Sequence, residues 1–291
     1  MTAWSAALYA LLCLIWGSTW LAIKIGLVGI PPVLSAGMRF TLSAALVGLV
    51  LAVRRRPLRL TRDDRICVLL LGLLVFWLDY AAIYWAETRI SSGLTAILFS
   101  TMPLMTALLS SVWMRSEVLN RRKLAGIGVG IAGTALLFWP HERVEPSQAL
   151  GMVAALGATF CAAINLVAMK RYGAQSDPFV LNFLGMSIGA ACLVATSAAL
   201  EPWTSVAWSR SNLLALSYLS VFGSLVAFSI YYHLIKVMDA TIVSLTTLIF
   251  PIVALALGHI FLGEEVSATA VVGIATVLAG VALATPLSRF R

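Results

Sequence analysis

Charged side chains are scarce in this sequence, and their scarcity excludes an ordinary soluble domain. Only 11% of the 291 residues are charged, whereas 61% are hydrophobic; a soluble globular domain carries about 25% charged residues. The mean hydropathy of +0.97 is typical of a chain that crosses a membrane several times. The formal charge of +8 is spread over short segments between apolar runs. A folded basic face for nucleic acid is therefore not predicted.

Motifs for metal, cofactor or covalent chemistry are also lacking. The four cysteines lie in or beside apolar runs without Cys-x-x-Cys spacing, which indicates neither a disulfide framework nor a zinc site. The sequence has no His-Glu-x-x-His motif and no Walker lysine motif. Gly185–Gly189 has the spacing of a nucleophile elbow, but that motif requires a strand and a tight turn, and here it falls within an apolar span. We expect neither an enzyme nor a bound cofactor.

Long apolar runs, by contrast, fill most of the chain. Each run has roughly 18 to 25 residues, enough to cross a hydrocarbon core of about 30 Å as a helix. Short connections rich in glycine and proline separate them. We predict an all-α membrane protein with ten transmembrane helices. The predicted spans are Trp4–Gly26, Leu34–Val53, Ile66–Ala86, Gly93–Met114, Lys123–Pro140, Ala149–Lys170, Phe179–Leu200, Asn212–Lys236, Ala240–Leu262 and Ala268–Pro286.

The basic residues of the connections predict the orientation, because cytoplasmic loops carry an excess of Lys and Arg. With the N-terminus inside, fifteen of these residues fall in inner segments and only Arg89, Arg143 and Arg210 in outer ones. Both termini are therefore predicted to be cytoplasmic, in a multi-pass protein of the cell inner membrane.

The two halves of the chain correspond in sequence. Lys24 and Lys170, like Pro32 and Pro178, are 146 residues apart; Pro103 and Pro251, Tyr84 and Tyr232, and Glu117 and Glu265 are 148 apart. Each half has five predicted helices, an odd number, so the second half is inserted upside down. We predict two inverted five-helix repeats, residues 1–145 and 146–291, an arrangement typical of secondary transporters with a substrate site between the repeats.

Several short motifs recur in order in both halves and carry a family resemblance. The first half has Trp16-Gly17-Ser18, Arg39-Phe40, Ala96 through Pro103, Glu117, and Gly126 to Gly133; the second has Ser244 through Pro251, Gly263-Glu264-Glu265, and Gly273 to Gly280. In this the chain resembles the drug/metabolite transporter superfamily, specifically its EamA-type exporters. The resemblance implies ten helices, inverted repeats, a central cavity and efflux of small metabolites, but no particular substrate. The second half departs from the pattern, with Ala162-Ala163 in place of Trp16-Gly17 and Gly185 in place of Arg39.

The first span contains a candidate substrate site. Two indoles, Trp16 and Trp20, are four residues apart and share a helix face, with Ser18 and Thr19 as hydroxyls and Gly17 permitting a close approach. The alternative is plain helix packing, with Gly17 at a helix contact.

Arg39 and Asp79 lie well within predicted spans at similar depths, and Lys24 lies nearer an end. A charge at the bilayer centre costs about 2.5–3.5 kcal/mol, so such residues are functional candidates. Arg39 would bind a substrate carboxylate through its planar fork, and Asp79 would accept an ammonium or carry a coupling proton. The alternative is a fixed structural Arg39–Asp79 ion pair.

Further candidates surround these charges. Trp77, Tyr80 and Tyr84 would complete an aromatic wall with Trp16 and Trp20, and Asn165 is a candidate donor to substrate or to another helix. Pro103 and Pro251 weaken their helices at related places, which suits either gating or a static kink.

We therefore predict a secondary or facilitative transporter that exports amino acids or similar small amphipathic metabolites by alternating access. Its partners would be the small-molecule substrate and the lipid bilayer, without nucleic acid; a monomer is compatible with the sequence, which does not fix the oligomeric state. The alternatives are an efflux carrier for organic cations or drugs and a non-transporting membrane scaffold or sensor.

Overall fold

The structure is a computed structural model, and it describes residues 3–113, 121–138, 145–172, 177–203, 206–237 and 246–284. Glu117 and Ser244 of the sequence motifs lie outside these residues. Helices make up the secondary structure of the described part, without strands. The elements of the first half are α1 (Ala3–Gly26), α2 (Pro32–Val53), α3 (Arg62–Leu70), η1 (Leu71–Asp79), α4 (Tyr80–Glu87), α5 (Ser92–Phe99), α6 (Met102–Trp113) and α7 (Arg121–Phe138). Those of the second half are α8 (Pro146–Tyr172), α9 (Pro178–Leu200), α10 (Arg210–Ser220), η3 (Val221–Val226), α11 (Ala227–Val237), α13 (Thr246–Leu262) and α14 (Ala268–Ala284).

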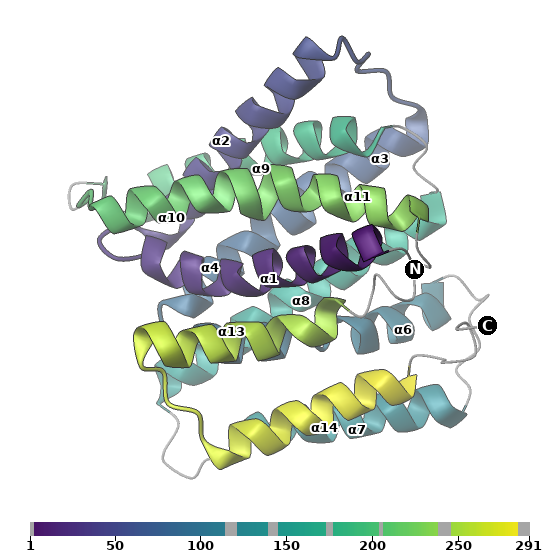
Figure 1. Cartoon of the computed structure of the whole chain (residues 1–291), viewed down its shortest axis with the longest axis vertical. Helices are drawn as coiled ribbons and strands as arrows, with labels where there is room; N and C mark the ends of the chain where they lie inside the picture. Colours follow the sequence, from purple (N-terminus) through teal and green to yellow (C-terminus); the bar gives the residue numbers. More distant parts are fainter. Residues whose placement is uncertain are drawn as a thin grey trace.

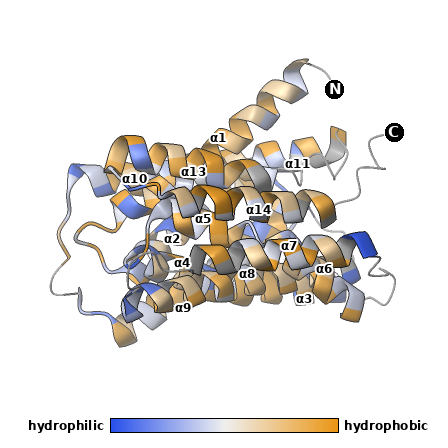
Figure 2. Cartoon of the chain, turned by 90° about the horizontal axis from the view of Figure 1, so that it is seen from below, coloured by the Kyte–Doolittle hydropathy of each residue, from blue (hydrophilic) through white to orange (hydrophobic). Residues whose placement is uncertain are grey.

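The helices lie side by side in an elongated bundle (Figure 1), and α1 begins at the same end of the bundle as α14 ends. Within the described residues, seven helices are long and apolar enough to cross a membrane, and shorter apolar helices cover Leu124–Gly133, Ile249–Leu262 and Val271–Gly280. These three fall on the remaining predicted spans. Figure 2 shows apolar residues along the helices and polar residues gathered toward their ends, as a bilayer requires.

Helix boundaries correspond between the halves. Pro32 and Pro178 begin α2 and α9, and each supplies a fixed φ at a position where no N–H is needed. Thr61 forms a capping box with Asp64 at the start of α3, and Ser209 forms one with Asn212 at the start of α10, 148 residues later. The third span of each half also contains a π-helical segment, η1 or η3. The local structure therefore repeats with nearly the spacing seen in the sequence.

The fourth predicted span is not one continuous helix. Residues 100–101 form a turn between α5 and α6, just before Pro103. A proline has no N–H to donate four residues back, to Phe99, and its ring crowds the preceding turn. Ser100 and Thr101 instead donate their hydroxyls to the carbonyls of Ile97 and Leu98, at 2.6 and 2.7 Å. Pro251, by contrast, lies inside α13, which continues through it.

Corresponding helices of the two halves pack against each other, α2 on α9 and α7 on α14. The α7–α14 pair lies along one side of the bundle (Figure 1). Its helices approach closely because Gly280 faces the backbone of Gly130, where a Cβ atom would overlap it. The main buried cluster lies among α1, α2, η1, α4, α8 and α9; it includes the candidate residues Trp20 and Tyr84, and Trp77 and Tyr80 pack against it.

Candidate functional site

Arg39 lies in the first half of α2, is buried in the interior and is only 2% exposed. Its Nη1 donates to the Tyr84 hydroxyl at a long 3.4 Å, while its Nε has no hydrogen-bond partner. The guanidinium carbon lies 5.1 Å from the ring centre of Phe40 and 5.0 Å from that of Tyr80. Aromatic faces attract a cation but do not neutralise it. Arg39 is thus a buried cation with spare donor capacity.

The ion pair between Arg39 and Asp79 that the sequence suggested is not formed. No ion pair within 4.0 Å joins these two described residues, whereas Arg56 and Asp177 near the surface do form one, at 4.0 Å. The physical reason is that depth along a helix does not fix direction around it, and Asp79 ends a π-helical segment whose phase differs from that of an α-helix. The fixed structural pair is therefore excluded as an explanation for these two charges.

Asp79 lies at the junction of η1 and α4 and is 3% exposed. The structure gives its carboxyl no hydrogen bond or ion pair, although the Cys161 thiol of α8 lies within electrostatic range. Its neighbour Trp77 turns to α9, where the indole Nε1 donates to Thr196 Oγ1 at 2.9 Å. Trp77 thus fastens η1 to α9.

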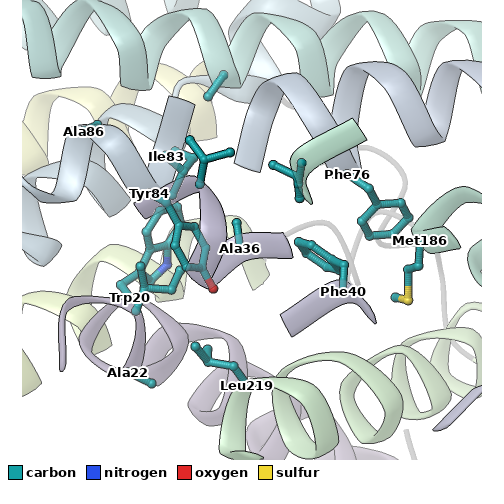
Figure 3. Close-up of a cluster of buried hydrophobic side chains, with 14 of the residues drawn as sticks. Trp20, Ala22, Ala36, Phe40, Phe76, Ile83, Tyr84, Ala86, Met186 and Leu219 are labelled. Atoms are coloured by element: carbon teal, nitrogen blue, oxygen red, sulfur yellow. The ribbon is translucent and has the colours of Figure 1, made fainter. Parts of the chain in front are cut away.

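An aromatic group surrounds the guanidinium. Phe40 meets Tyr80 edge to face at 4.5 Å between ring centres and Phe76 at 4.9 Å, and Tyr80 lies 6.4 Å from Tyr84. Figure 3 shows Phe40, Phe76 and Tyr84 in one buried cluster with Trp20. These four rings and Tyr80 come from α1, α2, η1 and α4, so they belong to one half of the chain.

The two indoles of α1 contact different neighbours. Trp20 packs in the main cluster, 5.5 Å from Phe99, whereas Trp16 meets Phe228, Tyr231 and Phe250 of α11 and α13 at 5.3–5.7 Å. A side chain at Gly17, between them, would overlap Val253 of α13. Gly17 thus lies at a close helix contact, as the packing interpretation expects.

The Ser18 hydroxyl links α1 to the second half, and Thr19 and Arg39 both lie beside Gly223 of that half. Ser18 Oγ lies 2.6 Å from the Tyr218 hydroxyl of α10, and Thr19 donates to the Trp16 carbonyl at 2.6 Å. A Cβ at Gly223 in η3 would be 3.0 Å from Thr19 Cγ2 and 3.3 Å from Arg39 Nη2. The structure thus brings Thr19 and Arg39 to the same π-helical segment. Sequence reasoning missed Tyr218 and Gly223 because neither carries a motif.

Asn165 of α8 is 9% exposed, and its Oδ1 has no hydrogen-bond partner. Asn165 is therefore a buried amide whose carbonyl oxygen can still accept a hydrogen bond. Pro103 is the second residue of α6 and Pro251 is buried in α13, so neither proline joins the group around Arg39.

Glu87 is a buried acid that sequence reasoning missed. The predicted third span ended at Ala86, so this carboxyl counted as a loop residue, yet it is 0% exposed and neither of its oxygens has a partner. The only sequence signal is its place one turn after Tyr84, which lies on the same side of an α-helix.

A bundle of apolar helices that buries Arg39, Asp79, Glu87 and Asn165 among other polar side chains defines a multi-pass membrane protein with a polar interior. The model of the EamA-like transporter family matches the chain twice, over residues 3–139 and 149–285. The chain belongs to this family, and it is a membrane transporter. The resemblance noted in the sequence is thereby confirmed.

Individual relatives agree with this family. Protein PagO of Salmonella typhimurium is 28% identical over 95% of this chain and 91% of its own length. YedA of Escherichia coli K12, named an inner membrane transporter, is 30% identical over 90% of this chain and 83% of its own. The name of YedA fits the family and a location in the inner membrane. A solved crystal structure superposes with a TM-score of 0.70 over 99% of this chain and 100% of its own, at 20% identity, and so shares the fold.

Proposed function

We propose that this transporter exports amino acids or similar small amphipathic metabolites across the inner membrane. The observation that carries the proposal is Arg39, a buried guanidinium with an unpartnered Nε and no carboxylate within 4.0 Å. A buried cation of this kind is costly unless an anion joins it. A substrate carboxylate would supply that anion through paired hydrogen bonds.

The remaining parts of a zwitterionic amphipathic substrate would find chemically suitable residues nearby. Tyr80 and Phe40 offer apolar ring surface beside Arg39. Asp79, which is buried and directly precedes Tyr80 in the sequence, would accept an ammonium. Trp16, Trp20 and Asn165 would line the path farther along the helices.

Alternating access would arise from two inverted five-helix repeats, residues 1–145 and 146–291, with both termini in the cytoplasm. Three observations support this part of the proposal: the repeated helix boundaries, a π-helical segment in the third span of each half, and the two separate family matches. The break before Pro103 and the buried Pro251 would provide places where the fourth span of each half bends.

A carrier for organic cations is the second candidate, and one observation favours it. Asp79 is buried without a cation beside it, as a site for a desolvated ammonium would be. Competition between unlabelled amino acids and quaternary amines for the same flux separates the two candidates. If quaternary amines compete and amino acids do not, the amino-acid proposal is wrong.

The test is counterflow of radiolabelled amino acids in proteoliposomes of wild type, Arg39→Gln, Arg39→Lys and the control Arg62→Gln. Hydrogen bonds to charged groups contribute about 1.5–3 kcal/mol, so Arg39→Gln should weaken half-saturation by about 10- to 100-fold. Arg39→Lys keeps the positive charge but loses the planar fork of donors, so its half-saturation concentration should lie between those of wild type and Arg39→Gln. Arg62 is exposed at the start of α3, and Arg62→Gln should behave as wild type. Unchanged half-saturation in Arg39→Gln would exclude carboxylate recognition by Arg39.

A further inference from the structure

Glu87 is the acid that the proposed substrate site leaves unused. It is the last residue of α4, at the end of the bundle that the loop charges predict to face away from the cytoplasm. Its side chain is 0% exposed, and both carboxyl oxygens are buried without a hydrogen-bond partner. An ionised carboxylate in such a place is costly, whereas the neutral acid avoids most of that cost.

A cation lies beside Glu87 but is bound to other atoms. The Lys24 ammonium of α1 donates to the backbone carbonyl of Glu87 and, at 2.7 Å, to that of Ile90. It therefore caps the C-terminal end of α4 and not the carboxyl group. Since the ammonium reaches the main chain of Glu87 itself, a change of local conformation would suffice to bring it to the carboxyl.

The other charges near Glu87 come from several elements. Glu264, after α13, accepts from the Ser92 amide at 2.8 Å and the Gly93 amide at 3.3 Å, at the start of α5. Arg39 of α2 and Glu264 both interact electrostatically with Glu87, and so does the Tyr84 hydroxyl on its own helix. Gly151 of α8 packs against the turn after α4, near Ile90 and Arg89. The Arg89 guanidinium stacks on Trp85, 3.4 Å from the centre of its ring.

The structure shows one arrangement of these contacts, in which Lys24 lies on the two carbonyls and ties α1 to the α4–α5 turn. The Glu87 carboxyl then has no counter-ion within hydrogen-bond distance, which favours its protonated form. In a second arrangement, loss of the proton would leave a carboxylate that draws Lys24 away from the carbonyl of Ile90 and breaks that tie. Glu87 is closed to solvent in the present arrangement, so proton exchange requires this end of the bundle to open.

We propose that Glu87 is a proton-binding site that couples transport, taking up or releasing one proton as this end of the carrier opens. The inference rests on the proposed transport function but not on the nature of the substrate. By the 148-residue offset of Tyr84 and Tyr232, the second half has Ile235 at this position, so it has no equivalent carboxyl. In this proposal Asp79 keeps the substrate-facing role proposed above.

The experiment compares wild type, Glu87→Gln, Glu87→Asp and Asp79→Asn in proteoliposomes, with and without an imposed pH gradient. Wild type should accumulate substrate when a pH gradient is imposed. Glu87→Gln should lose that accumulation but keep counterflow without a gradient, and Glu87→Asp should restore it. Asp79→Asn should lower the flux yet keep its response to the gradient. Three results would each overturn the proposal. Glu87→Gln could still accumulate substrate when a pH gradient is imposed, accumulation could be lost in Asp79→Asn alone, or accumulation by wild type could require a sodium gradient and not a pH gradient.

A second measurement does not require transport. Infrared spectra of the purified protein, titrated over pH in detergent, should show a band from a protonated buried carboxyl that disappears in Glu87→Gln and returns, shifted, in Glu87→Asp. If the band is present but no amino acid or organic cation is transported, the substrate proposal fails and the proton site stands. If Glu87→Gln retains every such band of the wild type, the proton site is refuted whatever the flux.

Discussion

The N-terminus of α2 depends on a carboxylate from the other half of the chain, and removing it should destabilise the protein. Glu201 accepts from the Val33 amide at 2.8 Å and the Leu34 amide at 2.9 Å. Pro31, at the N-cap position, makes no capping bond of its own. The alanine variant of Glu201 would therefore leave two N–H groups of α2 without a cap in a partly buried place.

The expected loss of stability follows from the two hydrogen bonds that Glu201 accepts and from its negative charge. Loss of a helix cap costs about 0.5–2 kcal/mol, and loss of a negative charge at a helix N-terminus adds about 0.3–1 kcal/mol. We expect Glu201→Ala to lower the free energy of unfolding by about 1–3 kcal/mol. By the scaling for chains of this size, 2 kcal/mol corresponds to a melting temperature lower by roughly 4–8 °C.

The assay is thermal unfolding in detergent, followed by the fraction of monodisperse protein after heating. Glu265→Ala is the matched control, since Glu265 is an exposed acid at the corresponding end of α13. Glu201→Gln keeps one carbonyl oxygen as an acceptor, so its melting temperature should fall less than that of Glu201→Ala. If Glu201→Ala and Glu265→Ala melt within about 1 °C of each other, a difference well below that expected for a lost cap, the capping argument is refuted.

Two further predictions concern the first and third spans. Gly17→Val should melt well below wild type, because the new side chain would overlap Val253 of α13. The control Gly157→Ala should melt as wild type does, because a Cβ atom at Gly157 meets nothing within 4 Å. Equal melting temperatures for the two variants would exclude the close α1–α13 contact. Asp79→Asn should lower transport while the protein elutes from size-exclusion chromatography as wild type does, because the amide is isosteric with the carboxyl; a wild-type transport rate would remove Asp79 from the mechanism.

The sequence predicts positions along the helices better than directions around them. Apolar runs and turn residues locate the helices, and Pro32 and Pro178 mark where α2 and α9 begin. The alternative of an Arg39–Asp79 ion pair was wrong because it rested on similar depth along the helices alone, while nine residues of the third span, Leu71–Asp79, are π-helical and change the direction of Asp79 around the helix. Nothing in an evenly apolar segment signals that change of period.

The candidate site shows the same limit. Arg39, Tyr80 and Tyr84 do lie together. An arginine in an apolar helix turns toward polar groups in the protein interior, and the two tyrosines, four residues apart, share one helix face. Glu87 was missed because hydropathy places a charged residue outside a span when it lies at the end of one. Burial at a helix end depends on tertiary packing by other helices, here in part on α1, whose Lys24 reaches the carbonyls of Glu87 and Ile90.

The α2–α9 pair is held unequally at its two ends, which bears on how the carrier would open. At one end Glu201 bridges to two amides of α2 within 2.9 Å. At the other, the polar contact that the structure shows is the Arg56–Asp177 ion pair at 4.0 Å, with side chains 57% and 31% exposed. Exposed pairs contribute about 0–1 kcal/mol and weaken with salt, less than a charged helix cap. If the two helices separate during transport, the Arg56–Asp177 end should part first, and the arrangement with Glu201 and Lys24 in place should be the one that excludes solvent from Glu87.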